Sequence, residues 1–156
     1  MMNTTHPSQN TRVLIVDDEL ATQVLLKSTL DEAGYETATT FNAEEALACV
    51  ADFDPSIAIV DIRLPGGMDG LELCHQLRQK HGVDVVVITG FSSEHGYVEA
   101  ADSGAQFRLS ISIGVAQCES EEDDKSLLKR ADMAMYEAKG MGRNQVFLAP
   151  TVDRVE

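Results

Sequence analysis

The sequence is short of several residue types, and each shortage narrows the kind of protein it can encode. It contains no tryptophan, and aromatic residues make up only 5% of the chain. Lys and Arg number 12 against 26 Asp and Glu, and the net charge of −14 argues against direct nucleic-acid binding. No apolar run approaches the ~20 residues that a membrane span needs, so no membrane association is expected.

Cysteine and histidine are also too sparse and scattered to build a disulfide framework or a zinc site. The three cysteines are odd in number and lack a CxxC spacing, and no metal-ligand spacing links the four histidines. The polar start of the chain holds no apolar signal core. These features predict a cytoplasmic protein with reduced cysteines, and 156 residues suit one domain of ordinary size.

Three short apolar runs lead directly into polar side chains. The runs and the residues that follow them are 13–16 with Asp17 and Asp18, 57–60 with Asp61, and 85–88 with Thr89. Unbroken apolar runs of this length are typical of parallel strands that are buried on both faces. Ligands bind at the carboxyl ends of such strands, so we expect the four polar side chains to converge on one pocket.

Stretches with helical spacing alternate with these strands. The expected order is strand 12–16, helix 20–33, strand 35–39, a helix capped by Asn42, strand 57–60, a helix ended by Gly82, strand 83–88 and a weaker helix over 92–102. In the first helix, Leu26, Leu30 and Ala33 are the expected apolar face. The alternation predicts an α/β fold with a doubly wound parallel sheet.

The pattern changes after residues 104–105. Apolar and polar residues alternate strictly over 107–115, which favours a half-buried strand near an edge or in an antiparallel pair. The acidic run 119–124 is expected to be a solvated loop before a helix over 126–139. The expected apolar stripe of that helix is Leu128, Ala131, Met135 and Ala138, and a last strand is expected at 146–148.

The expected pocket is rich in carboxylates. Neighbouring carboxylates repel one another unless a cation neutralises them, so Asp17, Asp18 and Asp61 predict a Mg²⁺ site. A cation there could orient a phosphoryl group for attack by one carboxylate. The alternative is that Asp17 and Asp18 cap the first helix, but Asp61 and Thr89 at corresponding strand ends favour the metal site.

Three motifs in this order resemble the receiver domain of two-component response regulators, over residues 11–105. They are Val-Asp-Asp-Glu at 16–19, Asp-Ile-Arg-Leu-Pro-Gly-Gly-Met-Asp-Gly at 61–70 and Ile-Thr-Gly at 88–90. The resemblance implies a flavodoxin-like sheet. It implies that Asp61 accepts a phosphoryl group from a sensor histidine kinase or phosphotransfer protein. It also implies Mg²⁺ held by Asp17, Asp18, Asp61 and the Arg63 backbone carbonyl, with Thr89 as the switch hydroxyl.

One part of the receiver pattern is missing. Receivers have a fifth strand that ends in Lys-Pro, and this Lys pairs with the phosphoryl group. Here the corresponding position holds Ser110 or Ile111, and Phe107 is the candidate for the aromatic switch residue. The resemblance therefore implies impaired or atypical switching.

The end of the chain resembles a different family, the GGDEF diguanylate cyclase domains, over residues 107–149. The similar stretches are 109–116, 128–139 and Gly-Arg-Asn at 142–144. The resemblance implies that Lys139 and Arg143 are remnants of GTP phosphate contacts. The alternative is that both are cations placed favourably at a helix C-terminus. Because the signature hairpin and the upstream metal Asp are absent, no cyclase activity is expected.

These patterns predict a disordered N-terminus (1–10), receiver-like units (11–105), a GGDEF-like strand-helix-strand completing the same domain (106–149) and a tail (150–156). The favoured function is a phosphoacceptor receiver. The second hypothesis is a pseudo-receiver that acts as an interaction or homodimerisation module. The third is a remnant of a receiver–GGDEF cyclase that has no cyclase activity.

Overall fold

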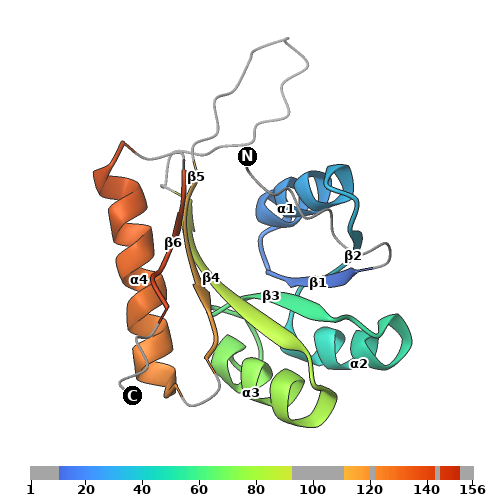
Figure 1. Cartoon of the computed structure of the whole chain (residues 1–156). Coiled ribbons are helices and arrows are strands. Elements are labelled where there is room, and N and C mark those ends of the chain that lie inside the picture. The colour runs from blue at the N-terminus through green and yellow to red at the C-terminus, as the bar shows by residue number, and fades with distance from the viewer. Residues whose placement is uncertain (1–10, 93–110, 120–121, 143–144, 152–156) are drawn as a thin grey trace, which may run out of the picture. The chain divides into compact units, whose positions relative to one another are not determined.

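The computed structural model describes residues 11–92, 111–119, 122–142 and 145–151. These residues form six strands and four helices, and the chain divides into two compact units, Met1–Val87 and Ile88–Glu156 (Figure 1). The fold is α/β with a mostly parallel sheet, as the sequence predicted. Residues 93–102 of the expected helix, strand residues 107–110 and both termini lie outside the described residues, and Ser92 is the last residue of a strand.

The first unit contains alternating strands and helices. They are β1 (Arg12–Val16), α1 (Leu20–Glu32), β2 (Glu36–Thr40), α2 (Ala43–Phe53), β3 (Ile57–Asp61), α3 (Gly70–His81) and the start of β4 (Asp84–Ser92). Strand β1 lies between β2 and β3 and is parallel to both, with Val13 opposite Thr37 and Ile57. Leu14 and Ile15 at its centre are fully buried. The predicted order of strands and helices is confirmed here.

Local hydrogen bonds explain where two of these helices begin. The Asn42 side chain accepts a hydrogen bond from the Glu45 backbone N–H at 2.8 Å, and the Glu45 carboxylate accepts one from the Phe41 N–H at 3.0 Å. The predicted cap at Asn42 is confirmed, and Glu45 in addition binds the N–H of the residue before the cap. The Asp69 side chain accepts a hydrogen bond from the Glu72 N–H at the start of α3, and Gly82 ends α3 with φ of +66°. Glycine adopts this left-handed conformation at no steric cost.

The predicted inward face of α1 is confirmed only in part. Leu26 and Leu30 are only half-buried, and Ala33 is exposed. The buried side chains of this helix are instead polar, Thr22 and Gln23. The physical reason is that this face of α1 lies over strand ends, where backbone carbonyls need hydrogen-bond donors.

The second unit holds the rest of β4, then β5 (Ile111–Gln117), α4 (Asp124–Gly140) and β6 (Val146–Leu148). Strand β5 is parallel to β6, with Ile113 opposite Val146, and its neighbours are β4 and β6. The predicted place near an edge of the sheet is confirmed, because among the described strands only β6 lies beyond β5. The alternating pattern of β5 arises because small residues, Ser112 and Gly114, are buried alongside the apolar ones.

Gly114 determines how closely α4 approaches β5. A Cβ atom at this position would collide with the backbone of Ala131 and Met135 on α4. Ala131 and Ala138 of the predicted stripe are buried, and the other two buried positions are Leu127 and Ala134, each one residue before the predicted one. Leu128 and Met135, which were predicted to be core residues, are half-buried.

The acidic segment before α4 is not fully solvated, contrary to prediction. The Glu122 carboxylate forms an ion pair with Arg130 and accepts a hydrogen bond from its Nε at 2.8 Å. The same guanidinium donates to the carbonyls of Gln117 and Pro150 at 2.7 and 2.8 Å. Only 2% of the Glu122 side chain is exposed, because Arg130 neutralises its charge and joins three segments of this unit.

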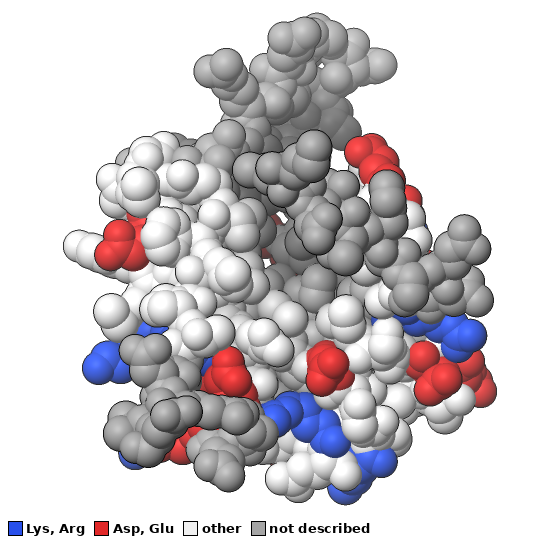
Figure 2. Space-filling view, in the orientation of Figure 1, with Lys and Arg blue, Asp and Glu red and all other residues white. Residues whose placement is uncertain are grey.

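The excess of acidic residues does not form one continuous acidic patch on the described part of the face seen in Figure 2. Figure 2 shows acidic and basic side chains interspersed on the described part of one face. Among the described residues, no helix combines the length and apolar character that crossing a bilayer would require.

Candidate metal centre

The acidic residues Asp17, Asp18 and Asp61 lie at the carboxyl ends of β1 and β3. Val16 is opposite Val60 in the parallel ladder, so the residues that follow the two strands emerge at the same edge of the sheet. One carboxylate oxygen from each residue lies within 4.8 Å of those of the other two. The predicted carboxylate cluster is therefore present in the first unit.

Backbone hydrogen bonds hold two of the three carboxylates. Asp17 is only 3% exposed, and its Oδ1 accepts a hydrogen bond from the Glu19 N–H at 2.7 Å. Asp61 is half-buried, and its Oδ1 accepts one from the Arg63 N–H at 2.9 Å. Asp18 is exposed, so the cluster has a buried side and a side open to solvent.

The pKa values of the two held carboxyl groups are raised. Burial raises the pKa of Asp17 to about 7, with further increases from the charges of Asp61 and Asp18, partly offset by the Glu19 N–H. Burial also raises the pKa of Asp61 to about 6, opposed by the Arg63 N–H. These shifts show that negative charge is unfavourable here without a neutralising cation.

The donor set fits Mg²⁺. It consists of three hard carboxylate oxygens, and Mg²⁺ keeps several waters beside a few such ligands. The capping alternative is not supported, because Glu19 is the N-cap of α1 and that helix has no side-chain cap. The Arg63 carbonyl as a further ligand stays a prediction.

Gln23 supports the cluster and was not identified from the sequence. Its Nε2 donates to the backbone carbonyls of Asp17 at 2.7 Å and Thr40 at 2.9 Å, and the residue is 3% exposed. It therefore fixes the segment that carries Asp17 and Asp18 against the end of β2. The only signal in the sequence is its position three residues before Leu26, which gives a polar residue on the predicted inner side of α1.

Gly70 fixes the segment after Asp61. A Cβ atom at Gly70 would collide with the backbone carbonyl of Asp61 and with the backbone of Ile62. Its N–H donates to the Ile62 carbonyl at 3.2 Å. Glycine is therefore required for α3 to begin directly behind the third carboxylate.

Thr89 belongs to the second unit and is 1% exposed. Its hydroxyl lies 3.4 Å from Asp132 Oδ1 and 3.8 Å from the Met135 sulfur, both on α4. Its expected convergence with the acidic cluster stays a prediction, because it concerns two separate units. Lys139 lies in the last turn of α4. Arg143, Ser110 and Phe107 lie outside the described residues, and Ile111 opens β5.

The first unit is thus an α/β domain with a candidate metal site of carboxylates at the carboxyl ends of β1 and β3. Residues 13–116 match the family model described as the response regulator receiver domain. The chain belongs to this family. Residues 92–145 also match the model of the GGDEF diguanylate cyclase domain, which confirms the predicted junction of two families.

Curated relatives agree with this assignment. Transcriptional regulatory protein AruR of Pseudomonas aeruginosa is 38% identical over 99 residues, 60% of this chain and 40% of AruR. The regulatory protein PhoP of Bacillus subtilis, named for alkaline phosphatase synthesis, is 30% identical over 126 residues, 80% of this chain and 51% of PhoP. The chain thus spans about half or less of the length of these relatives.

Solved structures with similar sequences include two receiver proteins. One is the signal receiver domain of a modulated diguanylate cyclase from Desulfovibrio desulfuricans, at 36% identity over 47% of this chain and 60% of that chain, with a TM-score of 0.46. The other is TrrA of Thermotoga maritima in complex with Mg²⁺ and BeF, at 39% identity over 48% and 65%, with a TM-score of 0.45. The family assignment rests on the sequence matches, not on these superpositions.

Proposed function

We propose that this chain is a phosphoacceptor receiver in which Asp61 takes a phosphoryl group from a histidine kinase or phosphotransfer protein. The observation that carries the proposal is the three-carboxylate cluster formed by Asp17, Asp18 and Asp61. Membership of the receiver family supports it. We further propose that the protein acts in the cytoplasm.

The proposed reaction is a transfer between two nucleophiles. An Asp61 carboxylate oxygen attacks the phosphorus of a phosphohistidine, an O–P bond forms, and the N–P bond breaks. The histidine nitrogen leaves with the bonding electron pair, and the product on this chain is an acyl phosphate. The Arg63 N–H bonded to Asp61 Oδ1 keeps one oxygen oriented, which leaves the other for the attack.

Asp17, Asp18 and Asp61 are the residues that would hold Mg²⁺, and the bound cation would neutralise the carboxylates and the incoming phosphoryl oxygens. Asp17 is suited to a holding role because it is buried and hydrogen-bonded. Asp18 is exposed and has room to adjust.

We propose that Thr89 is the switch hydroxyl and that switching is weaker than in receivers with the fifth-strand Lys. The sequence has Ser110 or Ile111 at that position, and neither side chain carries a positive charge. A charge-assisted contact with the phosphoryl group is therefore lost, and the energy difference between the two states is smaller.

The test is phosphorylation of the pure protein by a small phosphoramidate donor, with and without Mg²⁺, followed by intact-mass spectrometry. We expect one phosphoryl group per chain in the presence of Mg²⁺ and none in Asp61→Asn. Asp52→Asn, which removes an exposed carboxylate of α2, is the control and should be phosphorylated normally. Phosphorylation of Asp61→Asn at the wild-type rate would refute the proposal.

We propose that the GGDEF-like segment has a structural role and makes no cyclic dinucleotide. The match to that family covers only residues 92–145, and the sequence lacks the signature hairpin. Formation of cyclic di-GMP from GTP by the pure protein would contradict this part of the proposal.

A further inference from the structure

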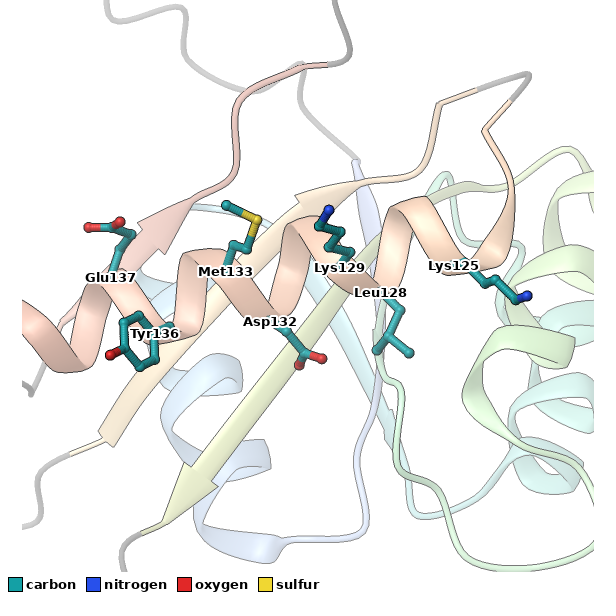
Figure 3. A pocket seen from close by; sticks show the side chains of 7 residues that line it. All are labelled: Lys125, Leu128, Lys129, Asp132, Met133, Tyr136 and Glu137. Atoms are coloured by element: carbon teal, nitrogen blue, oxygen red, sulfur yellow. The ribbon is translucent and has the colours of Figure 1, made fainter.

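The described contacts of the Thr89 hydroxyl group lie on α4. Its oxygen is 3.4 Å from Oδ1 of Asp132 and 3.8 Å from the sulfur of Met135, all within the second unit. Thr89 is 1% exposed, so solvent offers this hydroxyl almost no alternative partner. In Figure 3, Asp132 projects from α4 on the side where β4 runs, whereas Lys129 and Met133 project to the opposite side.

The packing of α4 on β5 positions both residues that contact Thr89. Gly114 on β5 lies directly against the backbone of Ala131 and Met135. Asp132 follows Ala131 in the helix, and Met135 contacts Thr89 through its own side chain. The part of α4 that is fixed by the glycine is therefore the part that reaches the hydroxyl.

The Thr89 hydroxyl carries a single proton, which it can donate to only one acceptor at a time. An ionised carboxylate acts only as an acceptor, and a thioether sulfur is a weak one. Asp132 is therefore the stronger of the two acceptors on α4. The proposed function assigns the same proton to a phosphoryl oxygen, which is a charged acceptor as well. The carboxylate and the phosphoryl group cannot both bind it.

We propose that Asp132 is a positioning residue that holds the Thr89 hydroxyl in the unphosphorylated protein and competes with the phosphoryl group for its proton. The inference rests on the proposed function of Thr89 and states how that residue is regulated. Phosphorylation has to displace the carboxylate, so the contact favours the unphosphorylated state. Removal of the carboxylate should make the phosphorylated state easier to reach.

The contact between Thr89 and Asp132 is suited to exchange. Its length of 3.4 Å exceeds the value of about 2.7–2.8 Å that is typical of O–H···O hydrogen bonds, so breaking it costs little. Asp132 is half-buried and lines a hollow of about 430 Å³ along α4, together with Leu128 and Tyr136. The released carboxylate can therefore turn toward solvent and need not stay in the core as an unpaired charge.

The first test asks whether Asp132 holds Thr89, and it involves no phosphoryl chemistry. NMR on the full chain measures how fast the Thr89 hydroxyl proton exchanges with water. We expect slow exchange in the wild type and exchange at least fivefold faster in Asp132→Ala, because the proton has lost its acceptor. Asp132→Asn keeps an oxygen acceptor and should restore slow exchange. Glu137→Ala removes an exposed carboxylate of the same helix and is the control.

A Thr89 hydroxyl proton that exchanges equally fast in the wild type and in Asp132→Ala would overturn the proposal. The same result would leave the proposed phosphorylation of Asp61 untouched, since this measurement is made without Mg²⁺ and without a phosphoryl donor.

The second test asks whether Asp132 competes with the phosphoryl group, with beryllofluoride in the presence of Mg²⁺ as the probe. We expect Asp132→Ala to bind beryllofluoride about fivefold more tightly than the wild type, and Asp132→Asn to bind it like the wild type. In a Thr89→Val background, Asp132→Ala should have no effect, because no hydroxyl is left to compete for.

An equal gain in affinity with and without the Thr89 hydroxyl would show that Asp132 does not act through Thr89, and would overturn the proposal. No gain in Asp132→Ala would do the same. A wild-type chain that binds no beryllofluoride in the presence of Mg²⁺ would instead refute the proposed function, and the competition with it, while hydroxyl exchange still decides whether Asp132 holds Thr89.

Discussion

The hydroxyl of Thr89 lies 3.4 Å from Oδ1 of Asp132, which links β4 to α4 within the second unit. The two residues are 43 positions apart and come from stretches that resemble different families. A family alignment of either part alone would not reveal this contact. The residue that the receiver resemblance assigns to switching is thus bonded to the segment that replaces the receiver's own C-terminal part.

We expect Asp132→Ala to lower the free energy of unfolding by about 1 kcal/mol, because the buried Thr89 hydroxyl loses its oxygen acceptor. The bond is long, so a larger effect is not expected. Asp132→Asn is the matched control, since its amide oxygen still accepts the hydrogen bond, and it should stay close to wild type. Urea denaturation followed by circular dichroism measures both. Equal stabilities for Asp132→Ala and wild type would show that the contact contributes nothing.

The raised pKa of Asp17 makes the stability of the metal-free protein depend on pH. The folded state holds this proton more tightly than the unfolded state, so the contribution of Asp17 to stability is greatest at low pH. It falls as pH rises from the ordinary value of 3.8 through about 7. Each unit of pKa shift corresponds to about 1.4 kcal/mol. Urea denaturation over this pH range should show the loss, and saturating Mg²⁺ should reverse it above neutrality.

Asp17→Asn removes the charge that causes this effect. We expect the variant to be more stable than wild type near pH 8 without metal, with a flatter pH dependence and weaker Mg²⁺ binding. Asp52→Asn removes an exposed carboxylate and should keep the wild-type pH profile. If Asp17→Asn kept the full pH dependence, the titrating group would have to lie elsewhere.

Gly114 offers a direct test of the packing between β5 and α4. The added methyl group in Gly114→Ala would collide with the backbone of α4, so we expect a loss of about 2 kcal/mol or more in unfolding free energy. Gly140→Ala is the control, because a Cβ there meets nothing within 4 Å and alanine favours the helix. Thermal denaturation should show a lower melting temperature for Gly114→Ala and an unchanged or higher one for Gly140→Ala.

The ion pair between Arg130 and Glu122 should be sensitive to loss of one partner. Arg130→Met leaves the nearly buried Glu122 carboxylate without its cation, and we expect a loss of about 3 kcal/mol. The double variant Arg130→Met/Glu122→Gln removes both charges and should recover part of the stability. Denaturant unfolding measures the free energy of unfolding of both variants. Equal losses would mean that the destabilisation comes from the hydrogen bonds of Arg130 to backbone carbonyls and not from the unpaired Glu122 charge.

Much of the fold was predictable because its signals are local. The apolar runs before Asp17 and Asp61, the cap at Asn42 and the stop at Gly82 each depend on a few neighbouring residues. The carboxylate cluster followed from the rule that parallel strands end at one edge. The partners of Gln23 and Glu122 could not be predicted in this way, because no periodicity or strand-end rule says which carbonyl or guanidinium a polar side chain contacts.

The buried stripe of α4 shows a second limit. Because Leu127 and Leu128 are adjacent, the helical pattern allows either of them to be the buried residue. The close approach of α4 to Gly114 on β5 favours the face that contains Leu127. The alternation over β5 is ambiguous for the same reason, since alternation with small buried residues resembles alternation with solvent-facing ones.

Gly70 and Gly114 each lie in direct contact with the backbone of another segment, and this limits which residues the two positions tolerate. Every replacement of glycine adds at least a methyl group, so neither position has a conservative substitute. In a library of single variants, both sites should be depleted of every alternative residue, including the smallest. Gly140, at the last position of α4, should accept most of them.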